Sequence, residues 1–520
     1  MSSTAKTPST ASTWIGYVAM CVGMFMAILD IQVVASSLAV VQKALAIPAD
    51  RISWIQTGYL MAEVIAIPLT GMLTRALSLR WLFVIAIAGF TLSSLGCAFS
   101  TSGDPLIAIR VVQGFFGGML IPAVFTSVFT ILPRKHEILA TTMAGVFAMV
   151  APTIGPYVGG WLTQHYSWHW IFLINIAPGI LVALTVAIFI RTGKSDLSLL
   201  KKIDYGTVLL AAIFLGTLEL LLKKAPEYHW TGNFVYALGA ICAVTGTLTI
   251  YFCLTRPRPF VDLRRFRRGP FAVGCVLSFI LGMGLYGSTY VGAVLLGPIR
   301  GHAPLEIGAI MMVAGIAQLI AAPLAALAES RVDGRAMVGL GYGLFAIGLF
   351  LNAGLATAGS TYVADYNAFF WPQILRGVAI MLCILPTTRL AMEGWKPEDA
   401  ADASGLFNLM RNLGGAIGIA VIDTILQQRT PQIATSLANR LQHGDPLAAA
   451  IVGLPTEAFH GQNMGTVDAA TRAAIEPMIR NAAAIQSFNE AWMVLGVLFV
   501  LALLAVPFIR AADVAPPKVI

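Results

Sequence analysis

Long apolar runs recur along the whole chain, separated by short polar or turn-rich segments such as Gly103-Asp104-Pro105. Each run reaches roughly 20 residues, which is the length that crosses a hydrocarbon core of about 30 Å as an α-helix. Fourteen spanning helices are predicted, near residues 15–40, 52–73, 81–101, 105–131, 140–163, 169–191, 204–222, 231–254, 270–297, 305–328, 336–357, 363–390, 400–426 and 490–510. The predicted fold class is therefore an all-α integral membrane protein, because a transmembrane barrel shows short alternating segments instead.

Composition agrees with this prediction and excludes several classes. The 520 residues are 58% hydrophobic and only 11% charged, far too few charges for a soluble surface. The net charge of +8 comes from loops rather than from a basic patch interleaved with aromatics, so nucleic acid is not a predicted partner. The six cysteines lie in apolar runs without CxxC spacing, and no metal or cofactor is predicted.

The distribution of lysine and arginine predicts the orientation in the membrane. Most of these residues fall in the two tails and in the loops after even-numbered helices, and few fall in the loops on the other side. By the positive-inside rule both termini face the cytoplasm of a bacterial cell, and the first apolar run is a retained helix. A polar segment near 427–489 then faces outward, and it is long enough to carry helices.

Two segments of the chain resemble each other in the same orientation. IRVVQGFFGGMLIP, followed by PRKHEILATTMAGVF, matches LRGVAIMLCILP, followed by KPEDAADASGLF. The match aligns Arg110 with Arg376 and Pro122 with Pro386. Parallel repeats of this kind build transporters from two bundles around a central site near the midplane of the membrane.

Ionisable residues inside the spans are the candidate functional residues, because each costs roughly 2.5 kcal/mol or more in a bilayer. In the first half these are Asp30, Glu63 and Arg110, which the predicted depths place in one aqueous cavity. A carboxylate there can bind a proton on one side of the membrane and release it on the other. The alternative is a structural ion pair between Asp30 and Arg110.

The second half contributes Arg376 and Arg411, which are predicted to serve the substrate cavity or coupling. Asn408 and Asn412 lie one turn or less from Arg411, and they are predicted either to share that role or to satisfy the arginine by hydrogen bonding.

Other charged residues within spans have simpler interpretations. Glu219 precedes Lys223 by four residues near a helix end, which favours a surface ion pair. Asp423 lies near the outer end of its helix and is a weaker candidate for a functional role.

The segment APTIGPYVGGW concentrates helix-modifying residues in the fifth span. Gly155 and Gly159 have the spacing that allows close helix contact, with Gly160 beside them. Pro156 removes a backbone hydrogen bond, and Pro152 lies one turn earlier. The sequence predicts a bent and tightly packed helix.

Taken together, these motifs resemble the major facilitator superfamily, and within it the fourteen-helix drug:proton antiporters of the EmrB/QacA type. GPYVGGW is similar to the superfamily's antiporter motif, and RVVQGFFGG to the motif whose arginine the family ties to proton coupling, here Arg110. LDIQVVASSL carries the family's first-helix acid onto Asp30, and SGLFNLMRNLGGAIGIA points to Arg411. The resemblance implies a six-helix bundle over residues 1–191, two additional helices within 192–268, and a second six-helix bundle over 269–520.

One departure from the family pattern concerns the loop between the second and third helices. The superfamily generally has G-x-L-x-D-R-x-G-R-R there, whereas this chain has GMLTRALSLR, with Arg75 in place of the acid. The cytoplasmic charge lock of this half is therefore in doubt.

The predicted function is proton-coupled export of small amphipathic molecules by alternating access, with protons and the lipid bilayer as the other partners. A dedicated exporter of one metabolite, such as a siderophore or an antibiotic, is the alternative. An enzyme is not predicted, since HExxH, GxSxG and P-loop motifs are missing from the sequence, and a passive channel fits the mid-depth charges poorly. The resemblance also implies a periplasmic adaptor and an outer-membrane channel as partners.

Overall fold

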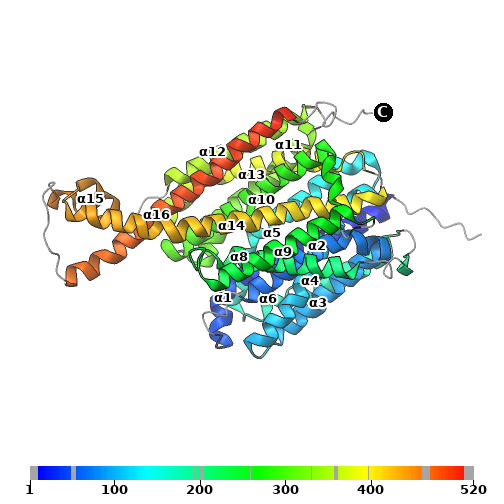
Figure 1. Ribbon diagram of the computed structural model, residues 1–520, viewed down its shortest axis with the longest axis horizontal. Coiled ribbons are helices and arrows are strands. Elements are labelled where there is room, and N and C mark those ends of the chain that lie inside the picture. Colours follow the sequence, from blue (N-terminus) through cyan, green and yellow to red (C-terminus); the bar gives the residue numbers. More distant parts are fainter. Residues whose placement is uncertain are drawn as a thin grey trace, which may run out of the picture.

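The computed structural model describes residues 10–47, 54–192, 195–198, 204–257, 259, 261–329, 331–355, 361–395, 397–459 and 469–508. All regular structure in these ranges is helical. Thirteen of the described helices are long and apolar enough to cross a membrane, and α5 becomes the fourteenth span when its two bent parts are counted together. The predicted fourteen-helix membrane fold is therefore confirmed (Figure 1).

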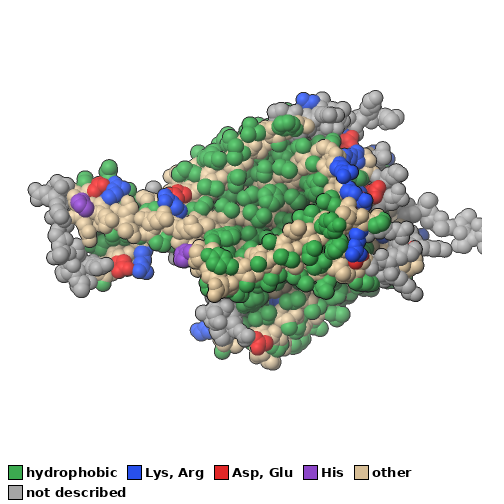
Figure 2. Space-filling view, in the orientation of Figure 1, with side chains coloured by type: hydrophobic (Ala, Val, Ile, Leu, Met, Phe, Trp, Pro, Cys, Tyr) green, Lys and Arg blue, Asp and Glu red, His purple; other side chains and the backbone are tan. Residues whose placement is uncertain are grey.

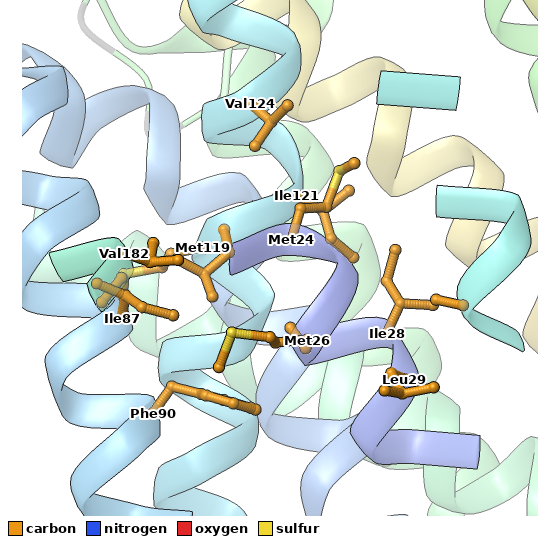
Figure 3. Close-up of a cluster of buried hydrophobic side chains, with 14 of the residues drawn as sticks. Met24, Met26, Ile28, Leu29, Ile87, Phe90, Met119, Ile121, Val124 and Val182 are labelled. Atoms are coloured by element: carbon orange, nitrogen blue, oxygen red, sulfur yellow. The ribbon is translucent and has the colours of Figure 1, made fainter. Parts of the chain in front are cut away.

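The first bundle contains the helices up to residue 189. These are α1 (Thr10–Ala44), α2 (Trp54–Leu77), α3 (Leu79–Ala98), α4 (Gly103–Thr130), α5 (Glu137–His165), α6 (Trp170–Leu173) and α7 (Ile176–Phe189), the last two forming one span. Methionine, isoleucine and phenylalanine side chains from α1, α3 and α4, together with Val182 from α7, fill the space between these helices, as Figure 3 shows around Met26 and Phe90. This packing fixes the helices that carry the buried charges described below.

The second bundle contains the helices from residue 269 onward. These are α10 (Gly269–Val294), α11 (Pro304–Glu329), α12 (Gly334–Leu355), α13 (Tyr362–Met392), α14 (Pro397–Gln442) and α16 (Ala469–Ala502). Between the bundles in sequence lie α8 (Tyr205–Lys224) and α9 (Asn233–Thr255), which pack on each other. Helix α8 also contacts α2 of the first bundle and α14 of the second, so it lies across the junction of the two.

The segment predicted as a polar loop near 427–489 is largely helical where the structure describes it. Helices α14 and α16 continue well beyond the bundle as a projecting hairpin, with α15 (Pro446–Val452) at its tip (Figure 1). A small core of Leu437 from α14, Val452 from α15 and Ala483 from α16 joins the three helices. The helix continues past residue 426 because apolar side chains recur at Ile433, Leu437 and Leu441, which keeps one face buried.

The outer surface has the character of a membrane protein. Figure 2 shows hydrophobic side chains over the length of the helices, with lysine and arginine gathered at one end and along the hairpin. We call the end that carries Arg75 and Arg265 the basic end, and the end from which α14 and α16 project the hairpin end. Exposed leucine and isoleucine side chains on α11, such as Leu319 and Ile320, belong to the apolar band between the two ends.

Candidate functional site

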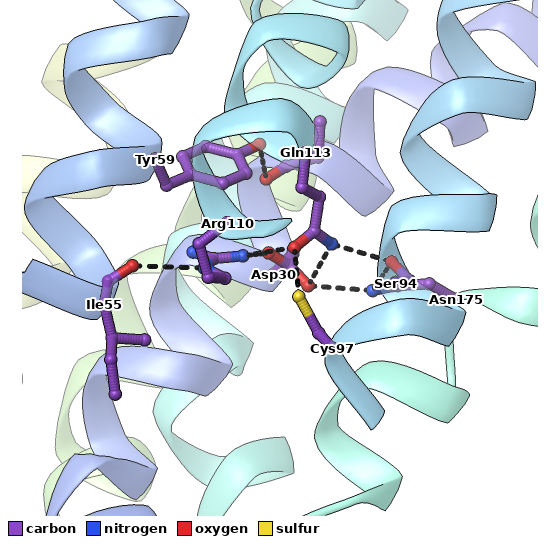
Figure 4. A network of polar contacts seen from close by, with 9 residues as sticks. Asp30, Ile55, Tyr59, Ser94, Cys97, Arg110, Gln113 and Asn175 are labelled. Atoms are coloured by element: carbon purple, nitrogen blue, oxygen red, sulfur yellow. Dashed lines mark hydrogen bonds and ion pairs between the residues drawn. The ribbon is translucent and has the colours of Figure 1, made fainter. Parts of the chain in front are cut away.

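A fully buried ion pair joins α1 to α4 inside the first bundle. The Arg110 guanidinium contacts the Asp30 carboxylate, and neither side chain has any exposed surface (Figure 4). The second carboxylate oxygen of Asp30 accepts hydrogen bonds from Asn175 at 2.8 Å and from Gln113 at 3.3 Å. Ser94 accepts from both of these amides. The charge on Asp30 is thus held by donors from other elements of the bundle.

Arg110 has a second set of contacts that fix its position. Its Nε donates to the carbonyl oxygen of Ile55 at 3.2 Å, and its guanidinium lies 4.2 Å from the centre of the Tyr59 ring. Its Nη2 has no hydrogen-bond partner within the described structure. If Asp30 took up a proton, the cation would lose its counter-charge in a site that water does not reach. Such an unpaired buried charge costs several kcal/mol, so protonation favours a rearrangement.

A cavity of about 630 Å³ lies between the two bundles. Its wall comes from both bundles and from α8, and it includes Gln32, Gln56, Pro152, Glu219, Lys223, Tyr286, Tyr290, Gln318, Arg376, Asp423 and Gln427. Gln56 stands near the start of α2 and Lys223 near the end of α8, so the cavity extends toward the hairpin end. A cavity of this volume is in the range that holds a drug-sized molecule.

Asp30, Glu63 and Arg110 do not line this cavity, contrary to the prediction that they share it. Asp30 and Arg110 satisfy each other inside the first bundle. Glu63 is 5% exposed, and its side chain makes no hydrogen bond or ion pair within the described part of the chain. The backbone of Glu63 packs against Gly118 of α4, since a Cβ on Gly118 would lie 2.6 Å from the Glu63 carbonyl oxygen. The predicted depth of a residue in its span does not say which side of the helix faces the cavity.

The two predicted arginines of the second bundle are buried without an acidic partner among the described residues. Arg376 borders the cavity and donates to Ser288 at 3.2 Å. Arg411 donates to Ser278 at 3.4 Å, and its guanidinium lies 5.1 Å from the centre of the Phe407 ring. The structure therefore brings neither arginine to a carboxylate.

The asparagines beside Arg411 do not satisfy it. Asn408 donates to the carbonyl oxygen of Ser404, one turn earlier in the same helix. Asn412 accepts a hydrogen bond from the Tyr286 hydroxyl at 3.4 Å. Of the two, Asn412 is the one next to the cavity, because Tyr286 lines it.

The glycine- and proline-rich run of α5 packs against α1. A Cβ on Gly159 would lie 2.7 Å from the carbonyl oxygen of Val33, and one on Gly155 would overlap the Gln32 Cβ. The helix bends by 44° between Pro152 and Ile154, in the turn before Pro156. Proline removes the hydrogen bond that would close that turn, which explains the bend. Gly160, the residue after Gly159, is also buried.

The basic end is closed by contacts between α2, α4 and α14. Arg75 of α2 forms an ion pair with Asp402 of α14, and Arg265 pairs with Asp402 at 3.2 Å and with Asp399 at 3.0 Å. The Ser404 hydroxyl donates to the Pro122 carbonyl oxygen at 3.3 Å. The expected acid at position 75 is absent, yet a charge lock is present with the signs exchanged, arginine on α2 and aspartate on α14.

Two groups of residues went unrecognised in the sequence. Glu219 and Lys223 of α8, interpreted as a surface pair, line the cavity. Asp423, named as the weaker candidate, lines it as well and accepts a hydrogen bond from Tyr290 at 2.6 Å. The available signal was the presence of acids within apolar spans.

The second unrecognised group lies at the hairpin end. Asp365, at the start of α13, is 1% exposed, and its carboxylate contacts Arg300 and His302. Among the described residues, no cluster of three or more histidine, cysteine, aspartate or glutamate side chains is arranged to hold a metal.

Two six-helix bundles around a central cavity, closed at one end by ion pairs, define a membrane transporter that works by alternating access. The family model described as Major Facilitator Superfamily matches residues 20–419. The chain belongs to this superfamily, in its branch of EmrB-type drug:proton antiporters.

Several characterised proteins are similar over most of the chain. The colistin resistance protein EmrB of Acinetobacter baumannii is 38% identical over 82% of each chain. The multidrug export protein EmrB of Escherichia coli is 27% identical over 93% of each, and the fatty acid resistance protein FarB of Neisseria gonorrhoeae is 26% identical over 92% of each.

Solved structures agree in fold. A proton-dependent oligopeptide transporter superimposes with a TM-score of 0.60 at 13% identity, covering 96% of this chain and 99% of the other. The proton:xylose symporter XylE gives 0.57 at 12% identity, covering 95% of each chain.

Proposed function

We propose that this protein exports small amphipathic molecules across the bacterial inner membrane in exchange for protons. The observation that carries the proposal is the sealed Asp30–Arg110 pair beside a cavity that extends toward one end and is closed at the other. Similarity to the multidrug export proteins EmrB of Escherichia coli and Haemophilus influenzae supports the direction of transport.

In the proposed cycle, the described conformation is the outward-facing state, with the basic end in the cytoplasm and both termini there. The distribution of lysine and arginine supports this orientation. Proton uptake by Asp30 releases Arg110, and the loss of the pair is relieved when the bundles rock and the cavity opens to the cytoplasm. Glu63 is proposed as a second proton acceptor, because it is buried on α2 without a partner in the described structure.

We also propose a separate role for each of the three segments of the chain. Residues 1–191 carry proton coupling, and residues 269–520 supply most of the substrate cavity. The two helices within 192–268 complete the cavity wall through α8, which is supported by Glu219 and Lys223 on that wall.

The test is transport in proteoliposomes with an imposed pH gradient, using a fluorescent amphipathic dye as substrate. Wild-type protein should concentrate the dye only while the gradient exists, and collapse of the gradient by an ionophore should stop transport. Asp30→Asn should not respond to the gradient. Glu476→Gln is the matched control, since Glu476 is exposed on α16 and pairs only with Arg480 in the described structure. Transport that ignores the gradient would refute proton coupling.

We further propose that the projecting hairpin binds a periplasmic adaptor that leads to an outer-membrane channel. The hairpin extends beyond the bundle on the side opposite the basic end, which supports contact with a partner outside the membrane (Figure 1). A pull-down from native membranes should recover the adaptor with wild-type protein. Recovery of the transporter alone after mild crosslinking would speak against this partnership.

A further inference from the structure

Arg376 is a positive charge on the cavity wall that nothing in the described protein neutralises. Its side chain is 5% exposed. Its Nη1 donates to the Ser288 hydroxyl at 3.2 Å, and its Nε has no hydrogen-bond partner among the residues that the structure describes. Within the described ranges no carboxylate forms an ion pair with it, in contrast to Arg110, whose counter-charge is built into the bundle. A buried cation is costly unless it is paired, which indicates that its partner arrives from outside the chain.

A second buried polar group on the cavity wall belongs to α11, the helix that packs on α13. Gln318 of α11 is 2% exposed and lines the cavity, and its Oε1 accepts no hydrogen bond from any described residue. Helices α11 and α13 touch at this level, since a Cβ on Gly377 would overlap the Ala314 carbonyl oxygen and lie 2.8 Å from the Ala317 Cβ. Arg376 and Gln318 are the immediate chain neighbours of Gly377 and Ala317. The two unsatisfied side chains therefore border the same part of the cavity.

The rest of the wall provides an apolar surface next to this polar corner. Leu285 of α10, Ile380 of α13 and Ile419 of α14 line the cavity together with Met311. The three acids that line the cavity are not on α11 or α13: Asp423 of α14 accepts a hydrogen bond from Tyr290, Glu219 is on α8, and Glu227 follows α8 and pairs with Lys224. An occupant with one anionic end and an apolar body matches this arrangement.

We propose that Arg376 and Gln318 form the headgroup subsite for an amphipathic anion, a carboxylate whose hydrocarbon body lies along α10, α13 and α14. The planar guanidinium of Arg376 can bind a carboxylate through two parallel hydrogen bonds. A 180° turn of the Gln318 amide exchanges its unpartnered oxygen for the nitrogen, which can then donate a third. This assignment rests on the proposed export function for its biological meaning, but binding itself can be measured without transport.

The experiment measures binding of dansyl-undecanoate to purified protein in phosphatidylcholine nanodiscs, with its methyl ester as the neutral counterpart. Decanoate and decyltrimethylammonium serve as competitors of the same chain length and opposite charge. We expect decanoate to displace the probe better than the cation does. Arg376→Gln should weaken binding of the carboxylate on the order of tenfold or more and leave binding of the ester unchanged, because a hydrogen bond to a charged group is lost. Arg376→Lys should recover part of the loss.

Control variants distinguish loss of this subsite from a general loss of folding or of positive charge. Arg480→Gln removes an exposed arginine of the hairpin and should bind like wild type. Arg376→Gln should also unfold at no lower temperature than wild type without ligand, because it removes an uncompensated charge rather than half of a pair. Equal losses for carboxylate and ester, or tighter binding of the cation, would overturn the proposal.

Two further results assign the occupant and separate this proposal from the export function. If phosphatidylglycerol in the nanodisc abolished probe binding, the subsite would belong to a lipid phosphate and the substrate assignment would fall. If the carboxylate bound through Arg376 but no pH-driven transport occurred, the headgroup subsite would stand and the export function would fail. If the protein transported the dye in response to the pH gradient but did not bind the carboxylate, the export function would stand and the headgroup subsite would fail.

Discussion

Replacing Asp30 by asparagine tests whether the buried pair is the coupling element or only a brace. The substitution keeps the size of the side chain and leaves an oxygen for Asn175 and Gln113, but it removes the counter-charge of Arg110. Both partners of the pair are fully buried. Removing one member of a buried pair costs about 3–5 kcal/mol, since the other is left as an isolated charge. Asp30→Asn alone should therefore lower the unfolding temperature clearly and abolish transport driven by a pH gradient.

The double variant Asp30→Asn/Arg110→Gln separates the loss of stability caused by an isolated charge from the loss of proton coupling. Removing both charges leaves no isolated ion, and a neutral replacement of a buried pair is often close to neutral in stability. The double variant should thus unfold at a higher temperature than Asp30→Asn while remaining insensitive to the pH gradient. Thermal unfolding in nanodiscs and dye transport in proteoliposomes give the two measurements. An Asp30→Asn protein that matched wild type in both, or a double variant less stable than either single one, would refute the reasoning.

Three further predictions follow from the packing and the ion pairs. Asp402→Arg should weaken closure of the basic end and change the transport rate several-fold, because Arg75 and Arg265 both lose their shared carboxylate. Arg75→Asp in the same protein should restore part of the rate, because the pair with position 75 re-forms with its signs exchanged while Arg265 keeps only Asp399. Two single-variant effects that simply add would count against a direct pair. Gly159→Val should block transport or folding, because the new side chain would overlap Val33 of α1. The control Gly339→Ala should have no effect, because no described atom lies within 4 Å of the new Cβ. Protein yield and dye transport measure both variants. Asp365→Asn should lower the unfolding temperature, because Arg300 and His302 lose a buried carboxylate; unchanged melting would show that other groups carry that site.

The sequence was sufficient for the fold because the bilayer imposes a simple rule. A span must satisfy its backbone internally, so apolar length alone identifies the helices. The same rule located Asp30, Arg110 and Arg376 as residues whose burial needs a physical reason, and all three are buried in polar or cavity-lining environments. Hydrophobic periodicity does not predict how each helix is rotated about its own axis, because the spans are apolar on most sides. The side of a helix that faces the cavity therefore stays unknown. Glu63 was for this reason assigned to a cavity that it does not line.

The sequence also could not identify ion-pair partners that lie far apart in the chain. Arg75 was interpreted as the loss of a charge lock because the motif was considered within its own loop. Its partner Asp402 lies on α14, and only the packing of α2 on α14 brings the two together. The role of α8 was missed for a similar reason: a pair four residues apart is equally consistent with a lipid-facing, a solvent-facing and a cavity-facing helix.

The extra helices have a consequence for how the bundles move. Helix α8 contacts both α2 and α14, and the indole nitrogen of Trp230, in the turn between α8 and α9, donates to the Thr424 hydroxyl of α14 at 2.8 Å. A rocking motion that opens the basic end must change the distance between α2 and α14, so α8 cannot keep both contacts unchanged. Because α8 also supplies Glu219 and Lys223 to the cavity wall, its displacement would alter the charge that faces the occupant. The charge on the cavity wall therefore depends on the relative position of the two bundles through α8, one of the two helices that twelve-helix relatives lack. A disulfide that fixes α8 to α14 should stop transport without preventing substrate binding.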